Sequence, residues 1–211
     1  MNNKGLFIKI SASVCVLFVL IIFIVSYNSL VKKEEQVLGS WSQVESVLQR
    51  KVDLIPNLVK TVQAYAQHEK EVLLETTKAR NVNMQAILSE LQENNQKLKS
   101  LSANGLPGSE NLANINAINK KLDTNIFKLM AISESYPNLK ASTNFLSLQA
   151  QLEGSENRIN VTRMHFNNSV SDYNTYIRTM PANMIAGMGG FTRKAYFKAD
   201  ENAHEKFDVT F

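Results

Sequence analysis

Residues 6–25 read LFIKISASVCVLFVLIIFIV, and this stretch decides the architecture of the chain. Its only charged residue is Lys9. Because a helix rises about 1.5 Å per residue, roughly 20 such residues span the ~30 Å hydrocarbon core of a bilayer. Lys9 lies near one end, where its stem can reach the headgroups, and Tyr27 lies at interface depth at the other. The pattern predicts a transmembrane anchor over residues 6–27, for which we take four marker residues: Leu6, Lys9, Val25 and Tyr27.

Two kinds of cleaved leader are the alternatives to an anchor. A secretory signal peptide needs a shorter apolar run followed by a small-x-small site, and residues 26–29 (SYNS) supply no convincing site. A lipoprotein signal needs a small residue before its cysteine and a longer apolar run ahead of it. Here Val14 precedes Cys15, and the cysteine comes too early. We therefore expect the anchor to stay uncleaved.

The charge distribution argues against a nucleic-acid partner and leaves the orientation open. The 23 Lys and Arg residues are scattered among 19 Asp and Glu residues, for a net charge of +4. A nucleic-acid-binding protein would gather its basic residues on one face or arm. Lys4 and Lys9 precede or enter the anchor, and Lys32 and Lys33 follow it. This bias is too small for the positive-inside rule to choose the side of the membrane on which the rest of the chain lies.

Beyond Tyr27, apolar residues recur every three or four positions, a pattern typical of amphipathic helices. The first such stripe contains Val37, Trp41, Val44, Leu48, Val52, Ile55, Val59, Val62, Ala66 and Leu73. It resumes with little turn signal after Tyr27, so we expect the anchor to continue into the first helix. Trp41 is interpreted as a core residue, with an interfacial anchor as the alternative.

Further stripes predict helices through residues 88–98, 112–132 and 145–177. They are separated by a Gly- and Pro-containing loop at 103–109 and by a break at 136–138, and Pro181 marks the end of the last helix. The predicted fold is all-α, an N-terminal transmembrane helix followed by an elongated antiparallel four-helix bundle with an irregular C-terminal tail. The predicted parts are a stub at 1–5, the anchor at 6–27, the bundle at 28–181 and the tail at 182–211.

A proline within the first helix predicts a kink. Pro56 lacks a backbone N–H and its ring clashes with the carbonyl four residues earlier. We expect Asp53 to cap a restarting helix, with Pro56 in its first turn. The motif that we assign to this kink comprises Arg50, Asp53, Pro56 and Asn57. A hinge or docking notch is the functional interpretation, and a structural kink is the alternative.

The tail is apolar, aromatic and rich in glycine. No strand precedes these glycines and no helix is predicted to open on them, which excludes a dinucleotide-binding loop. One interpretation is that the tail packs back along the bundle. The other is an interface with a partner or a second copy. The residues of that candidate interface are Met184, Gly187, Gly190, Phe191, Tyr196 and Phe197.

The sequence supplies no recognisable catalytic or metal-binding constellation, so we predict no enzyme, no cofactor and no metal. His68-Glu69 lacks the second histidine of a zinc-protease helix, and a hydrolase using this pair is the least favoured hypothesis. The remaining histidines, His165 and His204, have no ligand spacing either. Carboxylates and arginines of the bundle could meet as ion pairs that set helix register. These residues are Asp53, Glu69, Glu153 and Glu156, with Arg50, Arg80, Arg158 and Arg163.

Motifs in a fixed order resemble the LemA family over essentially the whole chain. They are residues 27–31 (YNSLV), Trp41, residues 48–59 (LQRKVDLIPNLV), Tyr65, His68-Glu69, Ala79-Arg80, residues 136–141 (YPNLKA), Phe145, Glu153, residues 156–159 (ENRI), Arg163, Val170, Tyr173-Asn174, Pro181, Asn183, Gly190-Phe191 and Tyr196-Phe197. Two positions depart from the family pattern: Phe166 replaces a usual tyrosine, and Met180 replaces a usual phenylalanine. The resemblance implies a bacterial membrane protein with one membrane helix and a helical-bundle domain, and it implies no reaction.

Together these observations predict a single-pass protein of the bacterial plasma (inner) membrane. Its leading functional hypothesis is a non-enzymatic scaffold that touches lipid through the N-terminal helix. Such a scaffold would form homo-oligomers or recruit membrane-associated proteins, because a tether raises the effective concentration of partners in the same membrane. The alternative is a sensor or adaptor that relays a change in the bundle through the kink at residues 53–56.

Overall fold

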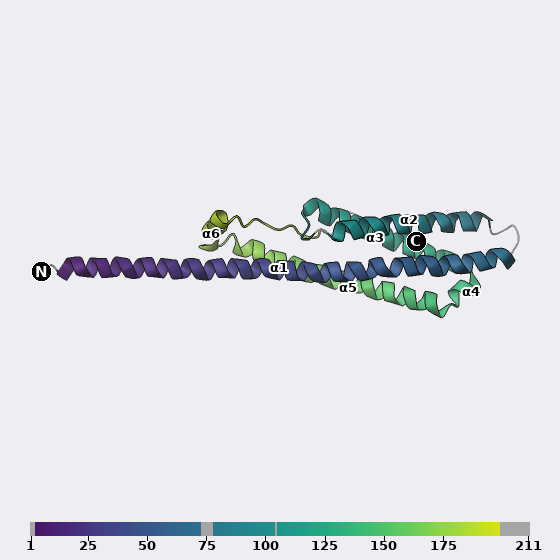
Figure 1. Cartoon of the computed structure of the whole chain (residues 1–211), viewed down its shortest axis with the longest axis horizontal. Helices are drawn as coiled ribbons and strands as arrows, with labels where there is room; N and C mark the ends of the chain where they lie inside the picture. Colours follow the sequence, from purple (N-terminus) through teal and green to yellow (C-terminus); the bar gives the residue numbers. More distant parts are fainter. Residues whose placement is uncertain (1–2, 73–77, 104, 199–211) are drawn as a thin grey trace, which may run out of the picture. The chain divides into compact units, whose positions relative to one another are not determined.

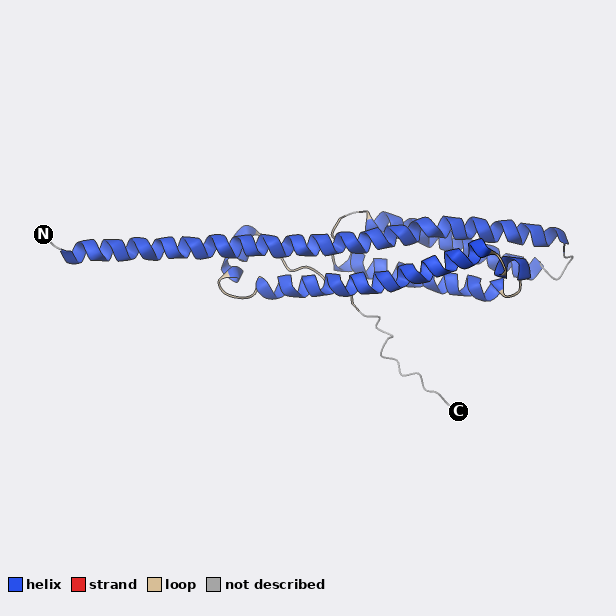
Figure 2. Ribbon diagram, turned by 90° about the horizontal axis from the view of Figure 1, so that it is seen from below, coloured by secondary structure: helices blue, strands red, loops and turns tan. Residues whose placement is uncertain are grey.

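The computed structural model describes residues 3–72, 78–103 and 105–198, and throughout these ranges every regular element is a helix (Figure 2). There are six: α1 (Asn3–Val72), α2 (Lys78–Ser102), α3 (Ser109–Ser133), α4 (Pro137–Lys140), α5 (Thr143–Tyr176) and α6 (Ala182–Gly189). The all-α prediction is confirmed. The extra helix α4 is a single turn that begins at Pro137, where the fixed φ of proline suits the first helical position.

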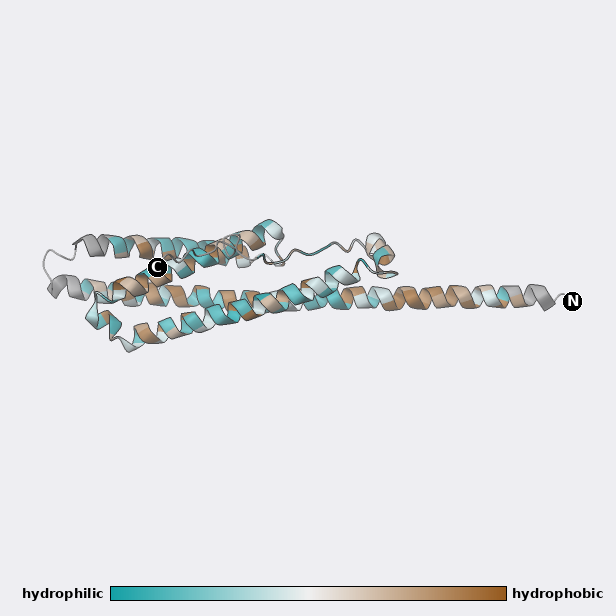
Figure 3. Ribbon diagram, turned by 180° about the vertical axis from the view of Figure 1, so that it is seen from behind, coloured by the Kyte–Doolittle hydropathy of each residue, from teal (hydrophilic) through white to brown (hydrophobic). Residues whose placement is uncertain are grey.

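Helix α1 is 70 residues long and runs through both the predicted anchor and the first amphipathic stripe. Its first part is almost continuously hydrophobic (Figure 3), and from Val14 to Val25 the large apolar side chains are exposed. Among the described residues α1 is the one helix long and apolar enough to cross a membrane. The expected continuity of anchor and first helix is confirmed.

The chain divides into two compact units that each draw on distant parts of the sequence. One unit contains residues 1–41 and 165–194, and the other contains residues 42–164 and 195–211. The first unit therefore holds the start of α1, the end of α5 and all of α6. The second holds α2 and α3, which lie side by side (Figure 1), with α4 and parts of α1 and α5.

Each unit has an apolar core built from the predicted stripes. In the first unit, Trp41 is 2% exposed and its ring meets the fully buried Phe166 ring edge-on, with centroids 5.8 Å apart. The interpretation of Trp41 as a core residue is thus confirmed. In the second unit the buried apolar residues include Leu48, Ile55, Leu91, Leu122 and Ile159.

The tail is less irregular than predicted, because it contains the eight-residue helix α6. We had not predicted this helix, which ends at the glycines and does not open on them. Gly190 comes at the helix end, where its left-handed conformation (φ 73°) caps the last turn. Only glycine adopts this conformation without steric cost.

Candidate functional site

The most unusual group in the described part of the chain is a fully buried lysine. Lys51 on α1 has 0% of its surface exposed, although lysine is among the residues least often buried. A buried ammonium group is tolerated only when it is paired and hydrogen-bonded. Its surroundings must therefore supply compensating acceptors, and they come from two other helices.

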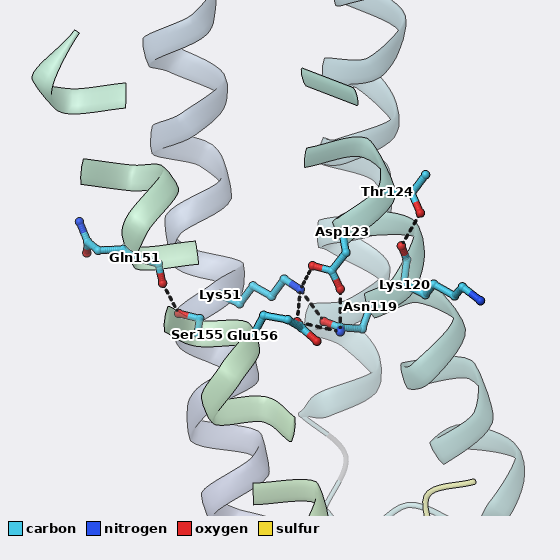
Figure 4. Close-up of polar contacts among 8 residues, drawn as sticks. All are labelled: Lys51, Asn119, Lys120, Asp123, Thr124, Gln151, Ser155 and Glu156. Atoms are coloured by element: carbon cyan, nitrogen blue, oxygen red, sulfur yellow. Dashed lines mark hydrogen bonds and ion pairs between the residues drawn. The ribbon is translucent and has the colours of Figure 1, made fainter. Parts of the chain in front are cut away.

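Three acceptors surround the ammonium group of Lys51 (Figure 4). Nζ donates to Asn119 Oδ1 at 2.9 Å, to Asp123 Oδ1 at 2.5 Å and to Glu156 Oε2 at 2.9 Å. An ammonium group has three donors, so each proton has its own acceptor. Asn119 and Asp123 lie on α3, and Glu156 lies on α5. We call these four residues the Lys51 cluster.

Asn119 ties the two carboxylates together. Its Nδ2 donates to Asp123 Oδ2 at 3.1 Å and to Glu156 Oε2 at 3.2 Å. The amide thus accepts from Lys51 with its oxygen and donates to both carboxylates with its nitrogen, which uses both ends of the side chain. The Lys51 cluster is a closed polar network that joins α1, α3 and α5 within the second unit (Figure 4).

The net pKa shifts of the two carboxyl groups have opposite signs, although Lys51 acts to lower the pKa of both. Burial raises the pKa of the Asp123 carboxyl, and the nearby Lys51 charge only partly offsets this because Glu156 repels a second negative charge. Burial also acts to raise the pKa of Glu156. The charge and hydrogen bond of Lys51 outweigh burial there, with help from Asn119 and Arg163, and hold the pKa of the Glu156 carboxyl below its usual value.

Sequence reasoning missed Lys51, Asn119 and Asp123, although the helical periodicity pointed to the first two. In α1 a strict alternation of three and four residues from Trp41 passes through positions 44, 48, 51 and 55 and so selects Lys51, whereas we had placed Val52 in the stripe. In α3 the same alternation, counted from Leu112 through Ile115, selects Asn119. Glu156 was expected to pair with an arginine, and its hydrogen-bonded ion pair is with Lys51.

The expected restart of the helix at Asp53 was wrong, because α1 runs unbroken through Pro56. Pro56 cannot donate to the carbonyl of Val52, four residues earlier. The side chain of Asn95 on α2 replaces the missing donor, with Nδ2 lying 3.0 Å from Val52 O. Asp53 is exposed and accepts a hydrogen bond from Gln49 Nε2 at 2.7 Å. The kink near Asp53 itself stays a prediction.

This exchange of donors predicts a specific coupling between Pro56 and Asn95. Asn95→Ala should lower the free energy of unfolding by about 1–3 kcal/mol, because a buried carbonyl loses its partner. In a Pro56→Ala background the same change should cost clearly less, since an alanine at this position supplies the N–H that α1 otherwise lacks. The measurement is thermal unfolding of the four proteins of the double-mutant cycle, followed by circular dichroism. Equal costs in both backgrounds would contradict the assignment.

In the first unit, Asn174 holds the extended chain that follows α6. Its Nδ2 donates to Lys194 O at 2.8 Å, and its Oδ1 accepts from Lys194 N at 2.9 Å. The side-chain amide therefore pairs with both the N–H and the C=O of Lys194, as the backbone of a neighbouring β-strand would. The Lys194 ammonium group lies 2.6 Å from Glu34 Oε1 on α1, and Tyr173 Oη donates to Thr192 O at 3.1 Å. We call Glu34, Tyr173, Asn174 and Lys194 the tail clasp.

The tail clasp predicts a loss of stability at alkaline pH. Burial, with the charge of Glu34, raises the pKa of Tyr173 from 10.0 to about 12. A raised pKa means that the folded protein favours the neutral phenol. The contribution of Tyr173 to the free energy of unfolding is therefore complete below pH 10 and is lost as the pH rises toward 12. Tyr173→Phe should flatten the fall of melting temperature in this window, and the exposed Tyr196→Phe should not. Identical slopes for wild type and Tyr173→Phe would refute this.

The predicted anchor and kink residues lie on α1. Lys9, Val25 and Tyr27 are exposed, and the side chain of Leu6 lies outside the described residues. All four residues of the kink motif are exposed: Arg50, Asp53, Pro56 and Asn57. The backbone carbonyl of Asn57 accepts a hydrogen bond from Thr61 Oγ1 at 2.9 Å. The kink motif thus surrounds a buried residue that we had not singled out, Lys51.

The residues of the candidate tail interface do not share one environment. Phe197 is buried in the second unit, where the Arg163 guanidinium lies 5.0 Å from its ring centre, so for Phe197 the packing alternative is correct. Phe191 is partly buried and its ring meets Tyr27 edge-on at 5.9 Å. Met184, Gly187, Gly190 and Tyr196 are exposed. The interface itself stays a hypothesis.

Within the described residues, no group of three or more His, Cys, Asp or Glu side chains could hold a metal ion. His165 is exposed on α5. The side chains of His68, Glu69 and Arg80, and all of His204, lie outside the described residues. The carboxylates of the Lys51 cluster neutralise the lysine. The hydrogen bonds of the cluster connect α1, α3 and α5 at fixed positions along each helix.

Comparison with known proteins identifies related sequences. The family model described as the LemA family matches residues 40–211. "Magnetosome protein MamQ" of Magnetospirillum gryphiswaldense is 28% identical over 187 residues, which cover 85% of this chain and 65% of the relative. "Magnetosome protein MamQ 2" of Paramagnetospirillum magneticum is 27% identical over 180 residues, covering 82% and 64%. This chain thus spans a little less than two thirds of the length of these relatives.

Proposed function

The chain belongs to the LemA family, and from this premise we propose that it is a non-enzymatic scaffold held in a membrane by the first part of α1. We further propose a single-pass topology in the plasma (inner) membrane of a bacterium. The rest of the chain would form an elongated antiparallel four-helix bundle that associates with further copies or recruits membrane proteins.

The observation that carries this proposal is the change of character along α1. From Val14 to Val25 the exposed side chains are large and apolar, which water does not favour over so long a surface. From Leu30 onward the same helix supplies fully buried residues, among them Val37 and Val44. One helix thus has a surface suited to lipid followed by a surface suited to a protein core.

The Lys51 cluster supports the scaffold part of the proposal. Three helices are connected by one ammonium group, so their relative register is specified by directional bonds as well as by apolar contacts. A scaffold needs such a register, because a binding surface assembled from several helices keeps its shape only if the helices do not slide.

Membrane insertion can be tested with one charge. Val19→Arg places a cation in the middle of the apolar run and should cost about 2.5–3.5 kcal/mol of insertion free energy, so a smaller fraction of the protein should resist alkaline extraction. Val161→Arg is the matched control, because Val161 is 50% exposed on α5 outside the run. Complete extraction of the wild-type protein would overturn the anchor.

The scaffold role needs a separate test. Crosslinking of the full-length chain in native membranes, followed by size analysis, should yield adducts larger than the monomer. The protein is then diluted in the membrane. The yield of adducts should fall if they come from self-association, and it should persist if they contain an abundant partner. If crosslinkers of several lengths yield only the monomer, the protein is not a scaffold.

A second candidate function is a sensor or adaptor, and it is favoured by the position of Lys51 just over one helical turn before Pro56. A change in the charge of the Lys51 cluster would act on α1 close to the one turn where Pro56 supplies no backbone N–H to Val52 O. Pro56→Ala should then alter the set of crosslinked partners while the melting temperature stays nearly unchanged. An unaltered set would argue against a relay.

A further inference from the structure

Helix α6 has two opposite faces. Ala182, Ile185 and Ala186 are at most 5% exposed. Met184 and Met188, four residues apart and therefore on one side of the helix, are 63% and 81% exposed. Met180, another four residues earlier, is 72% exposed in the preceding turn. We call the Met184 and Met188 side chains the methionine face, and no other part of the first unit described by the structure covers it.

The end of α6 lies against the last part of the apolar run of α1. A Cβ built on Gly189 would lie 3.9 Å from Tyr27 Cε2 and 2.8 Å from Phe191 Cε2, so a side chain at this position would force its neighbours to move. The rings of Tyr27 and Phe191 meet edge-on at 5.9 Å. The first unit contains both segments, so α6 is placed beside Tyr27 by contacts within one compact unit.

The tail clasp keeps α6 at this level. Asn174 on α5 and Glu34 on α1 both bind Lys194, five residues after the helix. Glu34 follows Tyr27 by seven residues, which is about 10 Å along a helix. The chain that follows α6 is therefore held within two helical turns of Tyr27.

Depth follows from this placement if, as proposed above, residues 6–27 span the bilayer. Tyr27 then lies among the headgroups, where tyrosine is enriched. α6 then lies at the same depth, and like Ile24 and Val25 at the end of the apolar run its methionine face is exposed. Arg178 and Arg193, before and after α6, are exposed and can approach lipid phosphates. Methionine suits a fluid acyl boundary because its unbranched side chain adapts its shape.

We infer that α6 is an interfacial helix, whose methionine face (Met184 and Met188) enters the boundary between headgroups and acyl chains beside Tyr27. The bound surface is lipid. The inference rests on the proposed membrane anchor and adds a second attachment to it, one that would fix the depth of the anchor and the rotation of α1 about its axis.

Quenching by spin-labelled lipids tests this in the full-length chain. Met184→Cys and Met188→Cys are made separately in a Cys15→Ser background, and each cysteine is labelled with an environment-sensitive fluorophore. The labelled proteins are reconstituted into liposomes of phosphatidylcholine and phosphatidylglycerol. Emission should shift to shorter wavelength and lose intensity with lipids whose nitroxide is near the headgroup. Asp172→Cys, an exposed polar position on α5, is the control and should respond to aqueous iodide instead.

A label at Val19→Cys separates the two proposals. If nitroxides deep in the acyl chains quench Val19 but no lipid nitroxide quenches Met184 or Met188, the anchor stands and the interfacial helix is wrong. If Val19 is not quenched either, the proposed anchor is wrong. A blue-shifted signal at Met184 that is insensitive to lipid nitroxides and disappears when the protein is diluted would assign the methionine face to a second copy and would also overturn the inference.

Discussion

Lys51→Met is expected to lower the free energy of unfolding by about 3–5 kcal/mol. The substitution keeps an unbranched apolar stem and removes the charge that Asp123 and Glu156 share. Their side chains are 36% and 30% exposed, so water offsets part of the repulsion and the loss should fall at the lower end of this range. Thermal unfolding of the detergent-solubilised chain measures it.

Lys97→Met is the matched control, because Lys97 also forms an ion pair, with Glu93 at 2.6 Å, but both side chains are more than half exposed. Such surface pairs contribute about 0–1 kcal/mol. A triple variant that also carries Asp123→Asn and Glu156→Gln should recover part of the loss, since it removes the unpaired negative charges. If Lys51→Met costs no more than Lys97→Met, the Lys51 cluster does not organise the second unit.

Lys51→Met should also make the free energy of unfolding depend on pH in the acidic range. In the wild type the lowered pKa of Glu156 means that stability is lost as the pH falls through that pKa, and the raised pKa of Asp123 acts in the opposite direction. Without Lys51 both carboxyl groups are buried beside a like charge, which favours protonation in the folded state. Lys51→Met should therefore gain stability as the pH falls from neutral to about 4, whereas the wild type should change little.

Phe166→Ala is expected to cost about 3–5 kcal/mol, the usual range for a fully buried phenylalanine. The loss combines the apolar area removed, the cavity left behind and the edge-on contact with Trp41. Trp41 is the only tryptophan in the chain, so its emission reports the change directly. We expect a shift to longer wavelength as water reaches the indole, together with a lower melting temperature.

Phe127→Ala provides the comparison, because Phe127 is 73% exposed on α3 and its truncation leaves no cavity. Its effect should stay within about 0.5 kcal/mol. An emission maximum in Phe166→Ala equal to that of the wild type would show that Phe166 does not shield Trp41, and the described core of the first unit would then be incorrect.

The sequence by itself determined the long helices and the apolar run, because both are local properties. The length of the apolar run accounts for the exposed residues 14–25. Glycine and proline residues mark the loop between α2 and α3, and Pro181 marks the end of α5. The same reading placed Trp41 in the core correctly.

Only the tertiary structure decided which polar residues meet. Lys51 binds residues 68, 72 and 105 positions away, and Pro56 is tolerated within α1 because Asn95, on another helix, binds Val52 O. No local pattern contains these pairs, because periodicity reports which side of a helix is buried and not which residue of another helix faces it. The register between helices is set by the summed packing of whole faces. The position of α6 could not be predicted from the sequence for the same reason. It contacts Tyr27 near Gly189, which is 162 positions later in the chain.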